Sequence, residues 1–250
     1  MINRFNFALL ALVILFTSCG SYKNIPYYQD LDKTKSSEEQ ISNYKPTVIA
    51  NADVIGINVS SRTPEASAIF NYGAKDPQSA LNGYVVDQKG EVQIPLIGAV
   101  KVAGFTTAQV QEKLNQLLLT YYKDPVSNVR ILNFKIAVYG DVLKPDVYSI
   151  KDEKITITQA LTMAGDLNIT ALRKNVVLVR EEDGKRNFVT IDLTSKSIFN
   201  SPYYYLKNND QIYVQPGKTK YATVETGYRT TSLILSGLSI VAIVIAATFR

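Results

Sequence analysis

Residues 83–125 read GYVVDQKGEVQIPLIGAVKVAGFTTAQVQEKLNQLLLTYYKDP, and the periodicity of this stretch changes half-way. Its first half holds two strand-like runs, Gly83–Asp87 and Glu91–Pro95, on either side of a Gln-Lys-Gly turn, which predicts a β-hairpin. Its second half opens with Thr106-Thr-Ala-Gln109, a capping-box pattern, and then places apolar residues at helical spacing: Val110, Leu114, Leu117, Leu118 and Tyr121. The stretch predicts strands followed by an amphipathic helix.

The same plan recurs after this stretch. A second capping box, Thr156-Ile-Thr-Gln159, opens a short helix, and Gly165 is expected at its C′ position. Further strand-like runs are Asp53–Val59, Lys135–Tyr139, Asp146–Ile150, Val176–Arg180, Phe188–Asp192 and Gln211–Gln215. Helical stretches interrupt the strands, so this order predicts an α+β fold with two small mixed domains in series.

Two sets of motifs resemble a known family. Tyr84–Gly104, with Tyr122-Lys-Asp-Pro125 after the helix, resembles the export domain of outer-membrane polysaccharide export lipoproteins of the Wza type. Segments in the second half resemble the soluble-ligand-binding β-grasp (SLBB) domain of the same family: Val138–Ile150, Ile157–Gly165 and Asp210–Val214. The sequence departs from the family at Asn51-Ala52-Asp53, where Pro-Gly-Asp is frequent, and it has room for one β-grasp domain only.

The resemblance implies an export domain at residues 48–133, an SLBB domain at 134–216, and a linker with a C-terminal membrane helix at 217–250. It also implies a homo-oligomeric ring, octameric in the best-known relatives, that carries capsular or exopolysaccharide across the outer membrane. The implied partners are the exported polysaccharide, outer-membrane lipid and an inner-membrane co-polymerase, often a tyrosine kinase. Catalysis and a cofactor are not part of that role.

The N-terminus is typical of a bacterial lipoprotein. Arg4 is followed by an apolar run, Phe7–Phe16, which indicates a signal peptide at residues 1–18. Phe16-Thr-Ser-Cys19 resembles a lipobox, and Cys19 is the only cysteine in the chain, so we expect it to be lipidated. Gly20 replaces the Asp that retains many lipoproteins in the inner membrane, which favours the outer membrane with the body in the periplasm. Residues 19–47 are expected to form the lipidated N-terminus and a flexible stem.

Composition excludes several kinds of chemistry. The chain has no histidine and one cysteine, which excludes the usual zinc ligands and every histidine-based catalytic triad. Its net charge of +5 is modest and dispersed, so nucleic acid is not an expected partner. No pair of carboxylates stands out as a glycosidase pair. We therefore expect neither an enzyme nor a metal site.

The C-terminal segment Leu233–Phe249 carries no charge over 17 residues, or about 25 Å of helix. On a helical wheel, the aliphatic side holds Ile234, Leu238, Val241 and Ile245. The opposite side holds the residues that we expect to line a pore, interrupted by Ile243: Arg229, Ser232, Ser236, Ser239 and Ala246. Close packing of small residues between membrane helices also explains such a stripe; the family resemblance favours the pore.

Two other functions remain open at this level. The chain fits an accessory β-grasp lipoprotein that binds a glycan or a protein and whose tail docks into another membrane protein without forming a pore. It also fits a carboxylate-based enzyme that processes polysaccharide, which requires a cleft with two facing carboxylates.

Overall fold

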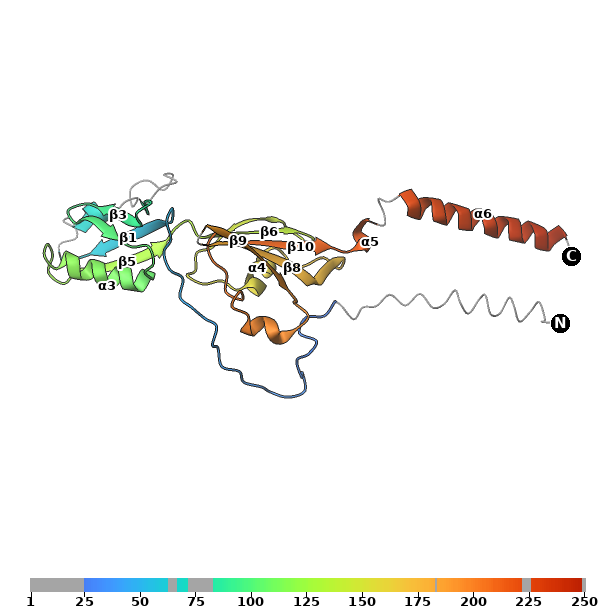
Figure 1. Cartoon of the computed structure of the whole chain (residues 1–250), viewed down its shortest axis with the longest axis horizontal. Coiled ribbons are helices and arrows are strands. Elements are labelled where there is room, and N and C mark those ends of the chain that lie inside the picture. The colour runs from blue at the N-terminus through green and yellow to red at the C-terminus, as the bar shows by residue number, and fades with distance from the viewer. Residues whose placement is uncertain (1–24, 63–66, 72–82, 183, 222–225, 249–250) are drawn as a thin grey trace.

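The computed structural model describes residues 25–62, 67–71, 83–182, 184–221 and 226–248. The predicted signal peptide and Cys19 lie outside these residues. The described chain forms two small bodies side by side and one helix that stands apart from both (Figure 1). Each body has its own hydrophobic core. The expected α+β fold, with a C-terminal apolar helix, is confirmed.

The first body contains a three-stranded antiparallel sheet with the order β2-β1-β5, built from Tyr84–Val85, Val54–Ser60 and Val126–Ile131. A separate hairpin joins β3 (Glu91–Ile94) to β4 (Gly98–Lys101). Helix α3 (Thr107–Leu118) buries one stripe against this body. The core beneath the helix includes Ile55, Ile57, Phe70 of the short helix η2 (Ala68–Phe70), Val92, Val100, Val110, Leu114, Leu118 and Val129.

The predicted hairpin between Gly83–Asp87 and Glu91–Pro95 is wrong. A tight turn does close there, since the Asp87 N–H donates to the Glu91 carbonyl at 2.9 Å. Its two strands then separate, because β2 pairs with β1 and β3 pairs with β4. The turn that makes the real hairpin contains Leu96 at φ 64° and Gly98 at φ 85°. Leucine seldom adopts a left-handed conformation, so residue 96 itself gives no signal for this turn.

The second body is a five-stranded sheet with the order β7-β6-β10-β8-β9. Only β6 and β10 run parallel, and the other neighbouring pairs are antiparallel. Helix α4 (Ile157–Met163) and the short helix η3 (Lys196–Asn200) each contribute to its core. The strands are β6 (Lys135–Gly140), β7 (Asp146–Ser149), β8 (Ala171–Glu182), β9 (Lys185–Ile191) and β10 (Gln211–Pro216).

Both predicted capping boxes are present. The Thr106 hydroxyl accepts from the Gln109 N–H at 3.2 Å, and the Gln109 side chain accepts from the Thr106 N–H at 2.9 Å. Thr156 and Gln159 repeat this arrangement at the start of α4. Gly165 follows the C-cap residue of α4 at φ 75°, as expected of a C′ glycine. These local signals fix where both helices begin.

Gly140 ends β6 at the point where it meets β10. Its φ is 101°, and a Cβ at this position would lie 2.1 Å from the Val214 carbonyl oxygen. That carbonyl accepts from the Asp141 N–H at 2.8 Å, so it is fixed in place. Any side chain at residue 140 would therefore separate the parallel strands.

A buried ion pair joins β8 to the start of β10. Arg180 Nε and Nη2 donate to the two carboxylate oxygens of Asp210 at 2.9 and 2.6 Å, and both side chains are at most 4% exposed. Arg180 also donates to the Tyr205 carbonyl at 3.0 Å, and Asp210 accepts from the Lys207 N–H at 2.7 Å. A bidentate pair with these additional bonds leaves few charged atoms without a partner.

Candidate functional site

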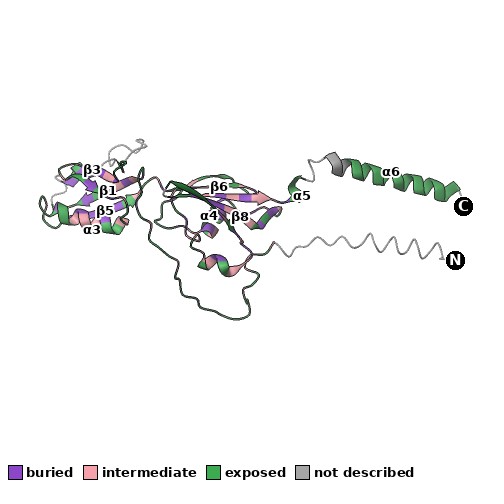
Figure 2. Ribbon diagram, viewed as in Figure 1, coloured by how far each residue is buried: buried purple, intermediate pink, exposed green. Residues whose placement is uncertain are grey.

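Helix α6 (Thr226–Thr248) is the most unusual element of the fold. Its window Thr230–Thr248 spans 19 residues with a mean hydropathy of 2.2, and none of the window is buried (Figure 2). At 1.5 Å per residue it is about 28 Å long, close to the ~30 Å hydrocarbon core of a bilayer. The helix is long and apolar enough to cross a membrane.

Three hydroxyl groups in the described part of α6 donate hydrogen bonds within the helix. Ser236 Oγ donates to the Ser232 carbonyl at 2.7 Å, and Ser239 Oγ donates to the Leu235 carbonyl at 2.8 Å. Thr248 Oγ1 donates to the Val244 carbonyl at 2.9 Å. Such back-bonding lets a serine enter lipid without an unsatisfied donor, while its acceptor lone pairs stay open to water or a neighbouring helix.

The structure places Ser232, Ser236, Ser239 and Ala246 on α6, all exposed. Arg229 also belongs to the helix, but its side chain lies outside the description, as does Cys19. The assignment of these residues to a pore remains a prediction.

The root of α6 is attached to the second body. Helix α5 (Lys218–Tyr221) follows β10, and Lys220 Nζ contacts Asp141 Oδ1 at 2.5 Å. Asp141 is fully buried and also accepts from Asn168 and Thr170. Burial raises the pKa of Asp141, but the bonds from Lys220, Thr170 and Asn168 outweigh it and hold that pKa below the ordinary value. The carboxylate is thus charged at neutral pH and holds α5 against the body.

Part of the predicted flexible stem is also attached to this body. The Gln29 N–H donates to the Thr194 carbonyl at 2.6 Å, and Asp30 accepts from the Lys196 N–H and the Ser195 hydroxyl. Those two bonds lower the pKa of Asp30. The Tyr27 hydroxyl donates to Asp166, and the burial of Tyr27, together with this bond, raises the pKa of its hydroxyl. These contacts therefore fix the start of the described stem to the second body.

The stem and α5 meet the same end of the second body. Tyr27 contacts Asp166, and Lys220 contacts Asp141. The loops that carry these two acids are joined, because the Leu143 N–H donates to the Asp166 carbonyl at 3.1 Å. Figure 1 shows the first body at the opposite end of the second body from α6. The chain thus runs out to the first body and returns.

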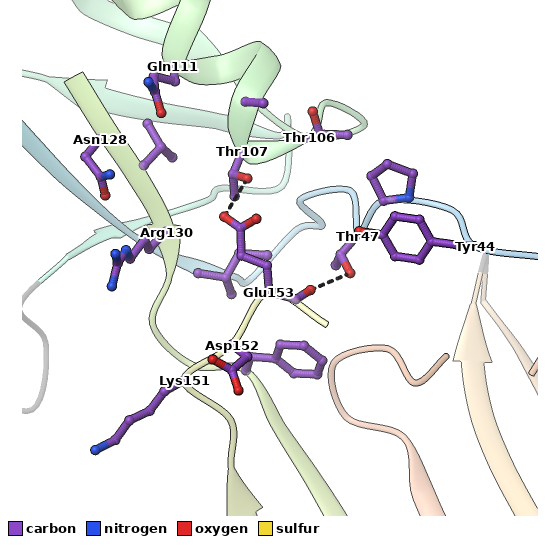
Figure 3. A pocket seen from close by; sticks show the side chains of 15 residues that line it. Tyr44, Thr47, Thr106, Thr107, Gln111, Asn128, Arg130, Lys151, Asp152 and Glu153 are labelled. Atoms are coloured by element: carbon purple, nitrogen blue, oxygen red, sulfur yellow. Dashed lines mark hydrogen bonds between the residues drawn. The ribbon is translucent and has the colours of Figure 1, made fainter. Parts of the chain in front are cut away.

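A cleft of about 390 Å³ lies between the two bodies. Figure 3 shows that the start of α3, strand β5, the stem and the loop before α4 contribute to it. Its polar and aromatic lining includes Tyr44, Thr47, Thr106, Thr107, Gln111, Asn128, Arg130, Lys151, Asp152 and Glu153. Cavities of this size between domains commonly bind small ligands.

The two carboxylates of the cleft do not face each other across a space. Glu153 points toward Thr107 and accepts from its hydroxyl at 3.0 Å, while Asp152 lies below Glu153 in Figure 3. The Glu153 carbonyl also accepts from the Thr47 hydroxyl at 3.2 Å. This arrangement ties the bodies together and differs from a glycosidase pair, which flanks the bond to be cleaved. Within the described ranges, no three acidic, cysteine or histidine residues form a metal site.

Comparison with known proteins identifies the first body. Residues 42–132 match the family described as polysaccharide biosynthesis/export protein. The EPS I polysaccharide export outer membrane protein EpsA of Ralstonia solanacearum is 38% identical over 91 residues. Over these residues the chain is similar to the polysaccharide export family. The EpsA of Ralstonia nicotianae is 29% identical over 136 residues.

These matches are partial. They cover 35% and 50% of the chain, and the chain spans only 24% and 36% of the length of the two relatives. The family is one of export proteins rather than enzymes. Sequence reasoning missed the docked stem, the Lys220–Asp141 pair and the cleft. None has a local signal, since each joins residues far apart in the chain.

Proposed function

We propose that the chain is an outer-membrane lipoprotein that exports capsular or exopolysaccharide from the periplasm to the cell surface through a homo-oligomeric channel. The observation that carries the proposal is α6. It is an apolar helix of membrane length, wholly exposed, on a chain whose residues 42–132 match an export family. A large exposed apolar surface marks a place that a membrane or a partner protein covers.

In this proposal, the lipid on Cys19 holds each subunit at the inner leaflet of the outer membrane. Residues 48–133 and 134–216 form the periplasmic ring as export and SLBB domains. Each α6 supplies one wall helix of the opening, which satisfies its own backbone bonds and can line a channel in lipid. Polymer growth, or an inner-membrane co-polymerase below the ring, gives the direction of transport.

The two sides of α6 would have different surroundings in such a channel. Ser232, Ser236, Ser239 and Ala246 face a wet lumen, together with Arg229. The aliphatic side faces lipid, where each Leu, Ile or Val favours insertion by about 0.3–0.6 kcal/mol. One helix cannot enclose a lumen, so this arrangement requires several copies.

Single cysteine variants test the orientation of α6. Cys19 is the only native cysteine and is acylated in the proposal, so each new thiol is a unique reporter. In intact outer membranes, Ser236→Cys and Ser239→Cys are expected to react with a charged thiol reagent. Leu238→Cys and Val241→Cys are expected to stay unlabelled until detergent is added. Labelling is measured by the mass of the purified protein.

The unaltered chain is the control, because it reports any reaction at Cys19 itself. Equal protection of all four thiols would mean that α6 packs against lipid or protein on every side. The accessory-lipoprotein function, with a docked tail, would then replace the channel. Equal labelling would mean that α6 does not lie in the membrane.

A further inference from the structure

The end of the second body nearest to α6 exposes several large apolar side chains. Leu143 is 63% exposed, Ile169 is 69%, Leu172 is 40% and Tyr221 is 52%. They lie in the loop after β6, the loop before β8, the start of strand β8 and the end of α5. We call these four residues the apolar end.

Hydrogen bonds and an ion pair fix these segments to one another. The buried Asp141 accepts from Asn168 and Thr170, which flank Ile169, and pairs with Lys220, next to Tyr221. A Cβ built on Gly165 would lie 3.0 Å from the side chain of Leu143, and the Gly217 N–H donates to the Thr170 carbonyl at 2.8 Å. The apolar end is therefore a fixed surface rather than four separate loop tips.

The positions of the two chain ends indicate what covers this surface. Tyr221 belongs to the apolar end, and α6 begins five residues later at Thr226. Even fully extended, five residues span only about 18 Å. The stem also docks here, because Tyr27 contacts Asp166 in the same pair of loops. If α6 spans a bilayer, the apolar end lies against the surface of that bilayer.

Charge supports the same partner. Lys144 follows Leu143 directly, and Lys218 lies one helical turn before Tyr221; both are exposed. Exposed lysines beside apolar side chains match a bilayer with anionic headgroups, because the apolar atoms enter the acyl boundary while the cations remain among the phosphates.

We propose that the apolar end is a lipid-contact surface, which inserts Leu143, Ile169, Leu172 and Tyr221 into the headgroup layer of the membrane that α6 enters. The inference rests on the membrane span of the proposed function. It adds a third attachment to the lipid on Cys19 and to α6, one that belongs to the folded body and fixes the height of the ring above the bilayer.

The chain contains no tryptophan, so single tryptophan variants report depth without background. The full-length protein carrying Ile169→Trp is reconstituted in vesicles of phosphatidylethanolamine and phosphatidylglycerol, with and without brominated acyl chains. Its fluorescence is expected to shift to shorter wavelength in the vesicles and to lose most of its intensity in the brominated ones. Leu143→Trp is expected to behave in the same way.

Phe188→Trp is the matched control, because Phe188 is also 69% exposed but lies in β9, away from the apolar end. It is expected to keep its full intensity. Val241→Trp reports separately on α6. Quenching of Val241→Trp without quenching of Ile169→Trp or Leu143→Trp would overturn the lipid-contact surface alone.

If bromine quenches none of the variants Ile169→Trp, Leu143→Trp and Val241→Trp, both the lipid-contact surface and the membrane span are overturned. Quenching of Ile169→Trp and Leu143→Trp alone would support the surface and overturn the span. A shift of Ile169→Trp to shorter wavelength without bromine quenching would show that protein covers the apolar end, which also contradicts the proposal.

Discussion

A chain that ends after Tyr228 is expected to fold and reach the outer membrane but to leave no polysaccharide on the cell surface. The truncation removes the window Thr230–Thr248 and leaves both folded bodies intact. Ten residues of Leu233–Phe249 are Leu, Ile, Val or Phe, so the loss amounts to about 3–6 kcal/mol of membrane insertion per subunit. In the proposed function, the lipid on Cys19 still anchors the shortened chain, so the truncation separates membrane attachment from transport.

Surface polysaccharide is measured on intact cells with a chromosomal truncation, alongside the amount of the shortened lipoprotein in the outer membrane. A second strain keeps the helix but carries Ser232→Leu, Ser236→Leu and Ser239→Leu, which leaves the span and removes its polar side. Loss of polymer in both strains is expected of a pore. Normal surface polymer in the truncated strain would eliminate α6 as the channel.

The substitution Asp210→Asn is expected to lower the free energy of unfolding of the second body by about 3–5 kcal/mol, as does the removal of one partner from other buried ion pairs. The amide cannot balance the charge of Arg180, whose side chain is only 4% exposed. Of its other contacts, Arg180 keeps the Tyr205 carbonyl and the ring of Tyr203, 5.3 Å from its guanidinium carbon. Neither carries a negative charge.

Urea unfolding followed by circular dichroism measures the effect. The control is Glu181→Gln, because Glu181 also pairs with an arginine, Arg186, in the hairpin of β8 and β9. The side chains of this pair are 59% and 61% exposed. An exposed pair contributes about 0.2–1 kcal/mol, so the control is expected to change little. Similar losses for the two variants would show that burial does not decide the strength of the Asp210 pair.

Local signals predicted helices α3 and α4, whereas the strand pairing and the attachment of the stem depend on contacts between distant residues. Thr106 and Thr156 meet their capping partners three residues away, so a short window of sequence is enough. The pairing of β3 with β4 depends on Leu96 in a left-handed conformation, which its residue type disfavours. Strand β5 escaped prediction because its exposed positions include Val126 among the polar residues, which blurs the alternation.

The candidate site, too, could be predicted from the sequence only where its features are local. The polar and aliphatic sides of α6 follow from helical spacing alone, although their roles remain to be measured. The attachment of the stem does not, because Asp30 and Ser195 are 165 residues apart in the chain. Lys220 and Asp141 are separated by 79 residues. Only the folded chain shows that the stem and α5 meet at one end of the second body.

The out-and-back path of the chain has a mechanical consequence. The first body is joined to the second body covalently by residues 132–134, and the stem that enters it from the other side is docked on the second body by hydrogen bonds, so a pull on the first body is shared by two routes (Figure 1). The Asn208–Asp53 and Thr107–Glu153 hydrogen bonds brace the joint between those routes. In the proposed function, the force of a growing polymer on the first body is therefore distributed over both routes and the hydrogen bonds between them.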